Sequence, residues 1–361
     1  MNNRILKKIN KKFSAISLKQ KIFALIFILL VFQICLIIEQ SRYNYINLDN
    51  VSLGKQIYLN CSHDVKIERI IDIVLATDDN YSPQCATVIA SVLLNCDATS
   101  YFRFHILDGG ITEENKSKIQ QLKSIRQFDI NFYDMKKYDW SDLPLNLSWI
   151  SSIATYYRLI INEILPNDVE KAIYLDCDVI VEQDLKNLWN IDISDKIFGG
   201  CESIVATKSI SRLKLDGNYF NAGILLINLK RLRNFDVKTE GIKYLKEKGK
   251  DIVYQDQDIL NGLFNKDCKY LSLKWNTYTN LFFSIKEKTS YTFEDAINAA
   301  YAPAIIHFTG PYKPWKTICS HPLQREYEKY FKYTAFENSL FNWKTINGFI
   351  RRCWITLRGF H

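Results

Sequence analysis

Two carboxylates and one imidazole carry the strongest chemical signal in this sequence. Asp176 and Asp178 lie two residues apart at the end of the apolar run 172–175. In an extended strand, alternation places both carboxylates on one face, and open α/β sheets bind ligands at the carboxyl ends of their strands. Two such oxygen ligands can hold Mg²⁺ or Mn²⁺ and leave positions open for phosphate. Taken alone, two acids at this spacing are more often solvated side chains in a turn.

The imidazole lies much later in the chain. His307 lies at the end of the apolar run 304–308, one residue before its last, and precedes the turn 309–315. An imidazole that joins two carboxylates gives a nitrogen and oxygen ligand set, which suits Mn²⁺ better than Ca²⁺. Lys313 is a point-charge donor for phosphate, and Gly310 allows close approach of the backbone. The alternative is a hydrogen-bonded core histidine followed by a proline-rich loop.

Two further polar clusters lie at the ends of predicted elements. The triplet 221–223 joins Asn221 to two small residues, which leave room for a sugar ring. The cluster 256–258 combines Asp256 and Gln257 with another acid at a predicted helix start, where capping explains acids almost as well.

A third cluster, 77–81, follows the first apolar run. Asp78 and Asn80 offer hydrogen bonds to a base and a ribose, and Tyr81 offers an aromatic face. A strand-to-helix turn favours Asp and Asn for purely structural reasons.

Strand and helix patterns alternate at short spacing, which predicts an α/β fold with a parallel sheet. The expected strands cover 70–76, 102–107, 127–133, 172–181, 219–229 and 304–308. The expected helices cover 86–95, a segment opened by Thr112, 151–165 and 255–264.

The two ends of the chain differ from its body. Segment 22–38 is almost wholly apolar and follows a basic arm, 1–21, that holds seven Lys and Arg and no acid. As a helix it spans about 25 Å, slightly less than the roughly 30 Å hydrocarbon core. A membrane anchor is expected here rather than a buried helix or a cleaved signal peptide. Segment 39–69 reads as a spacer. The aromatic and basic tail 321–361 is expected to lie on a membrane or to pack on the domain.

Charge and cysteine content exclude two classes of protein. The net charge is +8, but residues 22–343 carry 36 bases and 39 acids. A nucleic-acid groove requires a basic body, whereas basic ends suit an anionic membrane surface. The nine cysteines are scattered, without C-x-x-C, so they indicate neither a disulfide framework nor a zinc cluster.

Six ordered segments together give the sequence a family likeness. In order and spacing the chain resembles glycosyltransferase family eight, and in particular bacterial lipopolysaccharide glucosyl- and galactosyltransferases. The segments that carry this resemblance are 73–83, 154–159, 172–181, 219–229, 254–264 and 305–315.

The resemblance implies a GT-A fold over 70–320, a Rossmann-like mixed sheet flanked by helices that binds a nucleotide-diphospho-sugar. It implies that Mn²⁺, or Mg²⁺, is held by Asp176, Asp178 and His307. Uridine would contact Ala76, Asp78, Asn80 and Tyr81, and the nucleotide or sugar side would be reached by Arg158. The donor sugar would be surrounded by the catalytic residues Asn221, Asp256 and Gln257 and by Ala222. The diphosphate would be held by Gly310 and Lys313.

The activity implied is retaining transfer of glucose or galactose from UDP-glucose or UDP-galactose to a glycan or glycolipid acceptor, forming an α-linkage. Lipopolysaccharide is the expected acceptor, and front-face attack is the expected route, since Gln257 is at best a weak nucleophile. Three alternatives stay open. They are a nucleotidyl- or phosphotransferase, for which no Walker loop is found, an inactive glycan-binding scaffold, and a self-glycosylating primer.

The location follows from two opposed arguments. The positive-inside rule puts the basic arm in the cytoplasm, so a true span would place the catalytic domain outside. Bacterial UDP-sugars are cytosolic, and scattered free cysteines also favour the cytosol. The expected location is the cytoplasmic face of the bacterial inner membrane, held by 22–38 and the basic tail. A single-pass Golgi-type enzyme is the alternative.

Overall fold

The computed structural model describes residues 66–336, apart from 145–151, 204, 283–289, 312, 317–318 and 320. No helix among these residues has the length and apolarity needed to cross a membrane. The basic arm 1–21, the predicted anchor 22–38, most of the spacer 39–69 and the tail beyond 336 lie outside the described residues.

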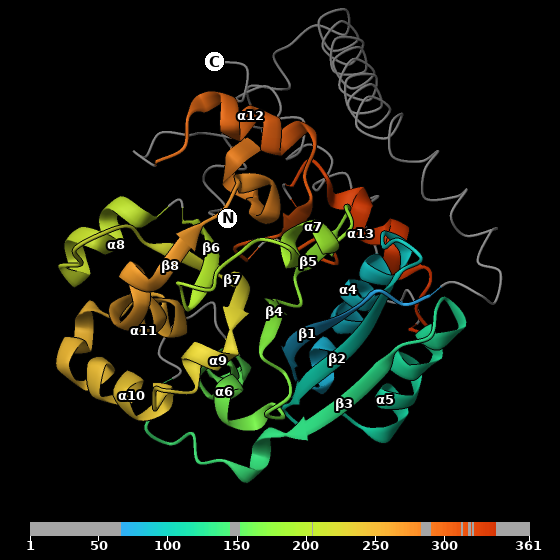
Figure 1. The fold of residues 1–361 in the computed structure, drawn as a ribbon, viewed down its shortest axis with the longest axis horizontal. Coiled ribbons are helices and arrows are strands. Elements are labelled where there is room, and N and C mark those ends of the chain that lie inside the picture. Colours follow the sequence, from blue (N-terminus) through green and yellow to red (C-terminus); the bar gives the residue numbers. More distant parts are fainter. Residues whose placement is uncertain are drawn as a thin grey trace, which may run out of the picture. The chain divides into compact units, whose positions relative to one another are not determined.

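A seven-stranded sheet forms the centre of the described domain, in the order β3-β2-β1-β4-β7-β6-β8 (Figure 1). The strands are β1 (Arg69–Thr77), β2 (Ser100–Asp108), β3 (Asp129–Asp134), β4 (Lys171–Leu175), β6 (Phe198–Glu202), β7 (Phe220–Asn228) and β8 (Cys268–Tyr270). The sheet is mixed, because β7 runs antiparallel to both β4 and β6. The prediction of a parallel sheet from the sequence pattern is therefore wrong, and the mixed sheet implied by the family resemblance is confirmed. The reversal matters for function, since it brings the start of β7 to the carboxyl end of β4.

A second, three-stranded sheet has the order β5-β10-β9. It contains β5 (Val179–Val181), β9 (Thr277–Tyr278) and β10 (Ile305–His307). The single strand expected over 172–181 is wrong, because the chain leaves the large sheet after β4 and enters this one as β5. The turn 176–178 joins the two sheets. The acidic break noted in the sequence is thus a change of sheet.

The helices pack around both sheets, and α4, α5 and α11 among them correspond to predicted helices. They are α4 (Ser82–Leu94), α5 (Glu113–Gln120), α6 (Ile161–Ile164), α7 (Lys186–Trp189), α8 (Ala206–Leu213), α9 (Leu229–Leu232), α10 (Val237–Lys248), α11 (Gln255–Phe264), α12 (Phe293–Tyr301) and α13 (Gln324–Phe331). Thr112 caps α5 as expected, accepting a hydrogen bond from the Asn115 amide. The helix expected over 151–165 is confirmed over 153–164, and most of it is a 3-10 helix, Ile153–Ile160, that continues into the short α6.

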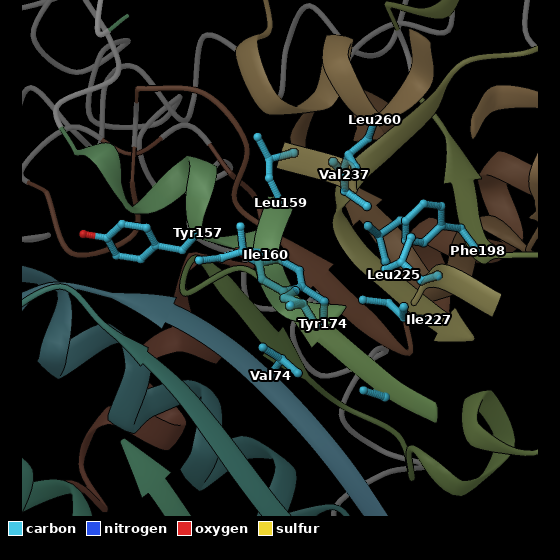
Figure 2. Close-up of a cluster of buried hydrophobic side chains, with 14 of the residues drawn as sticks. Val74, Tyr157, Leu159, Ile160, Tyr174, Phe198, Leu225, Ile227, Val237 and Leu260 are labelled. Carbon is cyan, nitrogen blue, oxygen red and sulfur yellow. The ribbon is translucent and has the colours of Figure 1, made fainter. Parts of the chain in front are cut away.

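Apolar side chains from β1, β4 and β7 form a continuous core with this 3-10 helix and with α11. Figure 2 shows Val74, Tyr174 and Leu225 of the three strands converging on Leu159 and Ile160. All five are at most 1% exposed. Burial of this kind contributes about 25 cal/mol per Å² of apolar surface. It holds the polar ends of the strands in fixed positions.

The chain beyond residue 320 continues onto the domain. Tyr327 and Tyr330 of α13 are buried. The side-chain amide of Asn95, at the end of α4, donates through Nδ2 to the Tyr330 hydroxyl at 2.8 Å. Helix α13 therefore packs on α4. The tail 321–361 was expected to lie on a membrane or to pack on the domain, and its residues 337–361 lie outside the described residues.

Beneath α13, two buried carboxyls share one ammonium. Lys329 Nζ lies 3.1 Å from Glu182 and 3.3 Å from Glu326. Burial and the charge of Glu326 raise the pKa of Glu182 to about 8. The folded protein therefore holds a proton on Glu182 that the unfolded chain releases above its ordinary pKa of 4.5.

This proton links stability to pH. Between about pH 4.5 and 8 the folded state binds more protons than the unfolded state, so stability falls as pH rises. Glu182→Gln, which stays neutral, should remove that slope. In thermal melts from pH 5 to 8.5, the melting temperature of the variant relative to that of the wild type should rise by about 3 °C or more as the pH increases. Glu170→Gln, at an exposed carboxyl, serves as the control. Parallel curves for Glu182→Gln and wild type would contradict the shared proton.

Candidate active site

A cavity of about 820 Å³ lies where the two sheets meet. Its wall is built from the end of β1, the turn 176–178, the start of β7, the first turn of α11 and the segment 307–316. All the residues predicted for the site line it except Asn80, which is exposed and outside the lining. Residues that lie far apart in sequence are thus brought together at one sheet edge. The volume is that of a pocket for a ligand of several hundred daltons.

Asp176, Asp178 and His307 form one cluster in this cavity. Each offers one ligand atom, and these three atoms all lie within 4.8 Å of one another. His307 Nε2 is 3.2 Å from Asp178 Oδ1 and 3.9 Å from Asp176 Oδ2. Two carboxylate oxygens and one imidazole nitrogen suit Mn²⁺ and leave coordination positions for an incoming ligand. The donor set and its spacing therefore fit a divalent metal ion.

Strand pairing positions these three side chains. His307 pairs with Val179 in the antiparallel β5–β10 ladder, and the Phe308 amide donates to the Asp178 carbonyl at 2.9 Å. On the other side, the Asp176 amide donates to the Gly223 carbonyl at 2.8 Å, which extends the β4–β7 pairing. Each of the three residues is therefore held in place by backbone hydrogen bonds that it or the adjacent residue forms.

Gly223 has a different role from the one expected. A Cβ at this position would lie 2.3 Å from His307 Cε1 and 2.6 Å from Asp176 Oδ2. The space left by its missing side chain is thus occupied by metal-site groups and not by a sugar ring. A glycine is required here for close packing.

Lys313 contributes the positive charge nearest to the cluster. Its ammonium contacts Asp178 Oδ2 and donates to the Phe308 carbonyl at 2.9 Å. Burial raises the pKa of Asp178, but Lys313 and His307 outweigh it and hold that pKa well below its ordinary value. The carboxylate is therefore ionised and ready to bind a cation. Gly310, with φ of +84°, forms the turn before Lys313 and has open space on its Cβ side.

Arg158 lines the cavity and is 7% exposed. It donates to Asp176 Oδ1 at 2.7 Å, lies 3.0 Å from Asp256 Oδ2 and also donates to the Ala222 carbonyl. Its guanidinium stacks on Tyr174 at 4.3 Å. These contacts hold two carboxylates in place. Contact between Arg158 and the nucleotide or sugar stays a prediction.

The 3-10 helix explains why a second residue meets Asp256. With three residues per turn, positions three apart share one face, so Thr155 and Arg158 both contact this carboxylate. Burial raises the pKa of Asp256 to about 6, although Arg158 and Thr155 oppose it. The carboxyl is thus already satisfied within the protein. The contact of Thr155 was not predictable from the sequence.

Gln257 and Asn221 form a linked pair at the side of the cavity. Gln257 Oε1 accepts hydrogen bonds from Asn221 Nδ2 at 3.0 Å and from the Ala222 amide at 3.1 Å. Both lone pairs of this oxygen are therefore engaged. An amide oxygen held in this way is a poor nucleophile, and its orientation is fixed.

The end of β1 supplies the opposite wall. Asp78 accepts from the Tyr81 amide at 3.1 Å and from the Ser152 hydroxyl at 2.8 Å. Tyr81 is held edge-on against Trp315, with ring centroids 5.7 Å apart. Asp78 and Tyr81 thus line the cavity, as does Ala76. Asn80 is exposed outside it, so its contact with uridine stays a prediction.

Two residues behind the site were not singled out in the sequence, although one of them, Tyr219, begins the segment 219–229. Asn276, at the end of the 3-10 helix Leu273–Asn276, accepts a hydrogen bond from His307 Nδ1 at 2.9 Å. Tyr219 is hydrogen-bonded to Gln257 Nε2 at 3.0 Å. Both are buried, and nothing in their local pattern distinguishes them from core residues. Only the tertiary structure shows their connection to the site.

The arrangement as a whole is that of a known class of enzyme. The chain is similar to a crystal structure of galactosyltransferase LgtC in complex with donor and acceptor sugar analogs. The matched region covers 74% of this chain and 97% of the LgtC chain, with 30% sequence identity and a TM-score of 0.66. The mixed sheet and the cavity at its edge therefore define a glycosyltransferase of GT-A type.

The family follows from the sequence comparison. Residues 72–319 match the profile of Glycosyl transferase family 8, and the chain belongs to that family. A lipopolysaccharide 1,2-glucosyltransferase of Escherichia coli is 30% identical over 245 residues, covering 66% of this chain and 71% of that protein. A lipopolysaccharide 1,3-galactosyltransferase of Salmonella typhimurium is 26% identical over 267 residues, covering 70% and 75%. The resemblance stated from the six segments is confirmed.

Proposed function

We propose that this protein transfers glucose or galactose from a UDP-sugar to a cell-surface glycan, with lipopolysaccharide as the acceptor. The observation that carries the proposal is the cluster of Asp176, Asp178 and His307 beside Lys313 in an 820 Å³ cavity. The names of the E. coli and Salmonella relatives support a hexose and a lipopolysaccharide acceptor. Uridine is the base that the family resemblance implies.

The donor diphosphate would bind where positive charge is concentrated. Asp176, Asp178 and His307 would hold Mn²⁺, which when bound neutralises charge on the diphosphate. Lys313 is next to the proposed metal position. Its ammonium would move partly away from Asp178 in order to reach a phosphate oxygen. Gly310 exposes its backbone at the same turn, where a phosphate can approach closely. These residues stabilise the charge that develops on the departing UDP.

The sugar would lie against Gln257, Asn221 and Asp256. We propose retention by front-face attack. The bond from the anomeric carbon to the diphosphate oxygen breaks, the acceptor oxygen bonds to that carbon on the same face, and the acceptor's proton passes to the departing phosphate. The engaged oxygen of Gln257 and the Asp256–Arg158 pair support this route, because neither group is free to attack. The product is an α-linkage.

Removal of the metal should stop this reaction. The full-length chain in detergent is incubated with a panel of UDP-sugars and lipopolysaccharide, and release of UDP is measured with Mn²⁺ or with EDTA. Release from one donor should fall at least about 100-fold in EDTA, because a Lewis acid supplies several kcal/mol. Equal rates in Mn²⁺ and EDTA would contradict the metal role. Failure to bind UDP at all would favour an inactive scaffold.

For its location, we propose the cytoplasmic face of the bacterial inner membrane. The basic arm, segment 22–38 and the tail 344–361 would provide the attachment. Labelling of Cys61 with a membrane-impermeant thiol reagent tests this. It should react only after the inner membrane is opened, and reaction in intact spheroplasts would place the catalytic domain outside.

A further inference from the structure

A chain of hydrogen bonds runs from a buried carboxylate behind the cavity to the metal-site histidine. It begins at Asp258, passes through Tyr219 and Gln257, and continues through two asparagines to His307. Asp258, Tyr219 and Asn276 are fully buried. None of these three is expected to touch the donor, so their role must be exerted through the residues they hold.

The direction of the chain is fixed at its first end. Asp258 binds Arg212 with both oxygens, at 2.9 and 3.0 Å, and can only accept. Tyr219 therefore donates its hydroxyl proton to Asp258, at 2.6 Å, and its pKa is raised by burial and by that carboxylate. The Tyr219 oxygen is left to accept from Gln257 Nε2 at 3.0 Å.

Two backbone amides fix the orientation of the next two side chains independently. The Ala222 amide donates to Gln257 Oε1 at 3.1 Å, and the Gly223 amide donates to Asn221 Oδ1 at 3.0 Å. An N–H requires an acceptor, so each of these atoms must be the oxygen of its side-chain amide. Asn221 Nδ2 consequently donates to Gln257.

The same reasoning decides the last link. Asn221 Oδ1 is an acceptor, so Asn276 must turn its Nδ2 towards it, at 2.8 Å. Its oxygen then faces His307 Nδ1 at 2.9 Å. That nitrogen has to carry the proton. His307 is therefore protonated on Nδ1, and Nε2 is the ring nitrogen that faces Asp176 and Asp178.

We infer that the chain from Asp258 to Asn276 sets the tautomer of His307, so that Nε2 is available to the metal before the metal arrives. Asn276 is then a positioning residue of the metal site, and the chain fixes Gln257 at the same time. Partners of this kind behind a histidine ligand typically contribute 10–100-fold to metal affinity. The inference rests on the metal site of the proposed function, but the tautomer itself does not require the metal.

The first experiment measures the tautomer directly in metal-free protein. Full-length wild type is labelled with ¹⁵N-histidine, treated with EDTA and examined by NMR at pH 9. The signals of His307, one of five histidines, are assigned by their loss in His307→Gln. We expect a proton on Nδ1. An unprotonated Nδ1, with the ring proton on Nε2, would overturn the inference.

The second experiment measures Mn²⁺ affinity from the free-ion EPR signal. Asn276→Leu, of similar volume, should bind Mn²⁺ about 10–100-fold more weakly, and its His307 should carry the proton on Nε2. Asn162→Leu is the matched control, since Asn162 is buried but bonds only the Phe235 carbonyl among the described contacts. An Asn276→Leu affinity within twofold of wild type would overturn the inference. A wild type that binds no Mn²⁺ would instead refute the proposed metal site, and the NMR result would still decide the tautomer.

Discussion

Asp178→Asn should lose transfer by at least about 1000-fold while the protein stays folded. The substitution keeps the shape of the side chain but replaces a charged oxygen ligand by a neutral one. It removes the negative charge of a metal ligand that also pairs with Lys313, and electrostatic stabilisation of the leaving group is usually the largest contribution to such reactions. We expect Mn²⁺ affinity to fall along with the rate of UDP release.

Folding should survive because the metal-free site places two carboxylates close together. Removing one negative charge relieves repulsion from Asp176, and an amide oxygen at 178 still accepts a hydrogen bond from Lys313. Circular dichroism melts should therefore remain near those of the wild type. Asp129→Asn, at an exposed carboxylate on the edge strand β3, is the matched control and should keep full activity. If Asp178→Asn retained more than a tenth of the wild-type rate, the assignment of Asp178 as a metal ligand would be wrong.

Much of this site was predictable because its residues lie at the ends of elements with strong local patterns. Asp176 and Asp178 follow a buried strand, and His307 ends another. Local pattern also predicted α11 over Gln255–Phe264 and β7 over Phe220–Asn228. The order of the six segments then added the family, which no single cluster had established.

What the sequence left unpredicted depends on partners distant along the chain. The reversal of β7, and the change of sheet between β4 and β5, are set by pairing and not by local preference. Apolar runs in parallel and antiparallel buried strands look alike. The helix expected over 151–165 formed, but its 3-10 geometry could not be predicted, because a buried 3-10 helix and an α-helix have nearly the same composition.

Arg158 and Gly223 show the same limit at single residues. Both stood in recognised segments, yet their contacts within the protein were not predicted. Arg158 binds two carboxylates of the protein itself, and Gly223 makes room for His307. Residue type indicated that each position belonged to the site, whereas the partner could be assigned only from the three-dimensional contacts.

Gly223→Ala should be almost as damaging as the loss of a metal ligand, although it adds a single methyl group. That methyl would lie 2.3 Å from His307 Cε1 and 2.6 Å from Asp176 Oδ2, distances that side chains do not tolerate. His307 is held by Asn276 and Asp176 by Arg158, so neither can yield without breaking its own contacts. We expect the ligand atoms to be displaced, Mn²⁺ affinity to fall and UDP release to drop about 300-fold or more.

The comparison that isolates this effect is Gly200→Ala on the neighbouring strand β6. There the added methyl would meet the flexible end of Leu225 at 3.2 Å, away from any ligand. Both variants insert the same group into the same sheet, so general damage to the sheet would lower both rates alike. Initial rates and Mn²⁺ binding should fall only in Gly223→Ala. Equal activity of the two variants would show that the cluster of Asp176 and His307 can move aside, and that their close packing against β7 does not set the metal geometry.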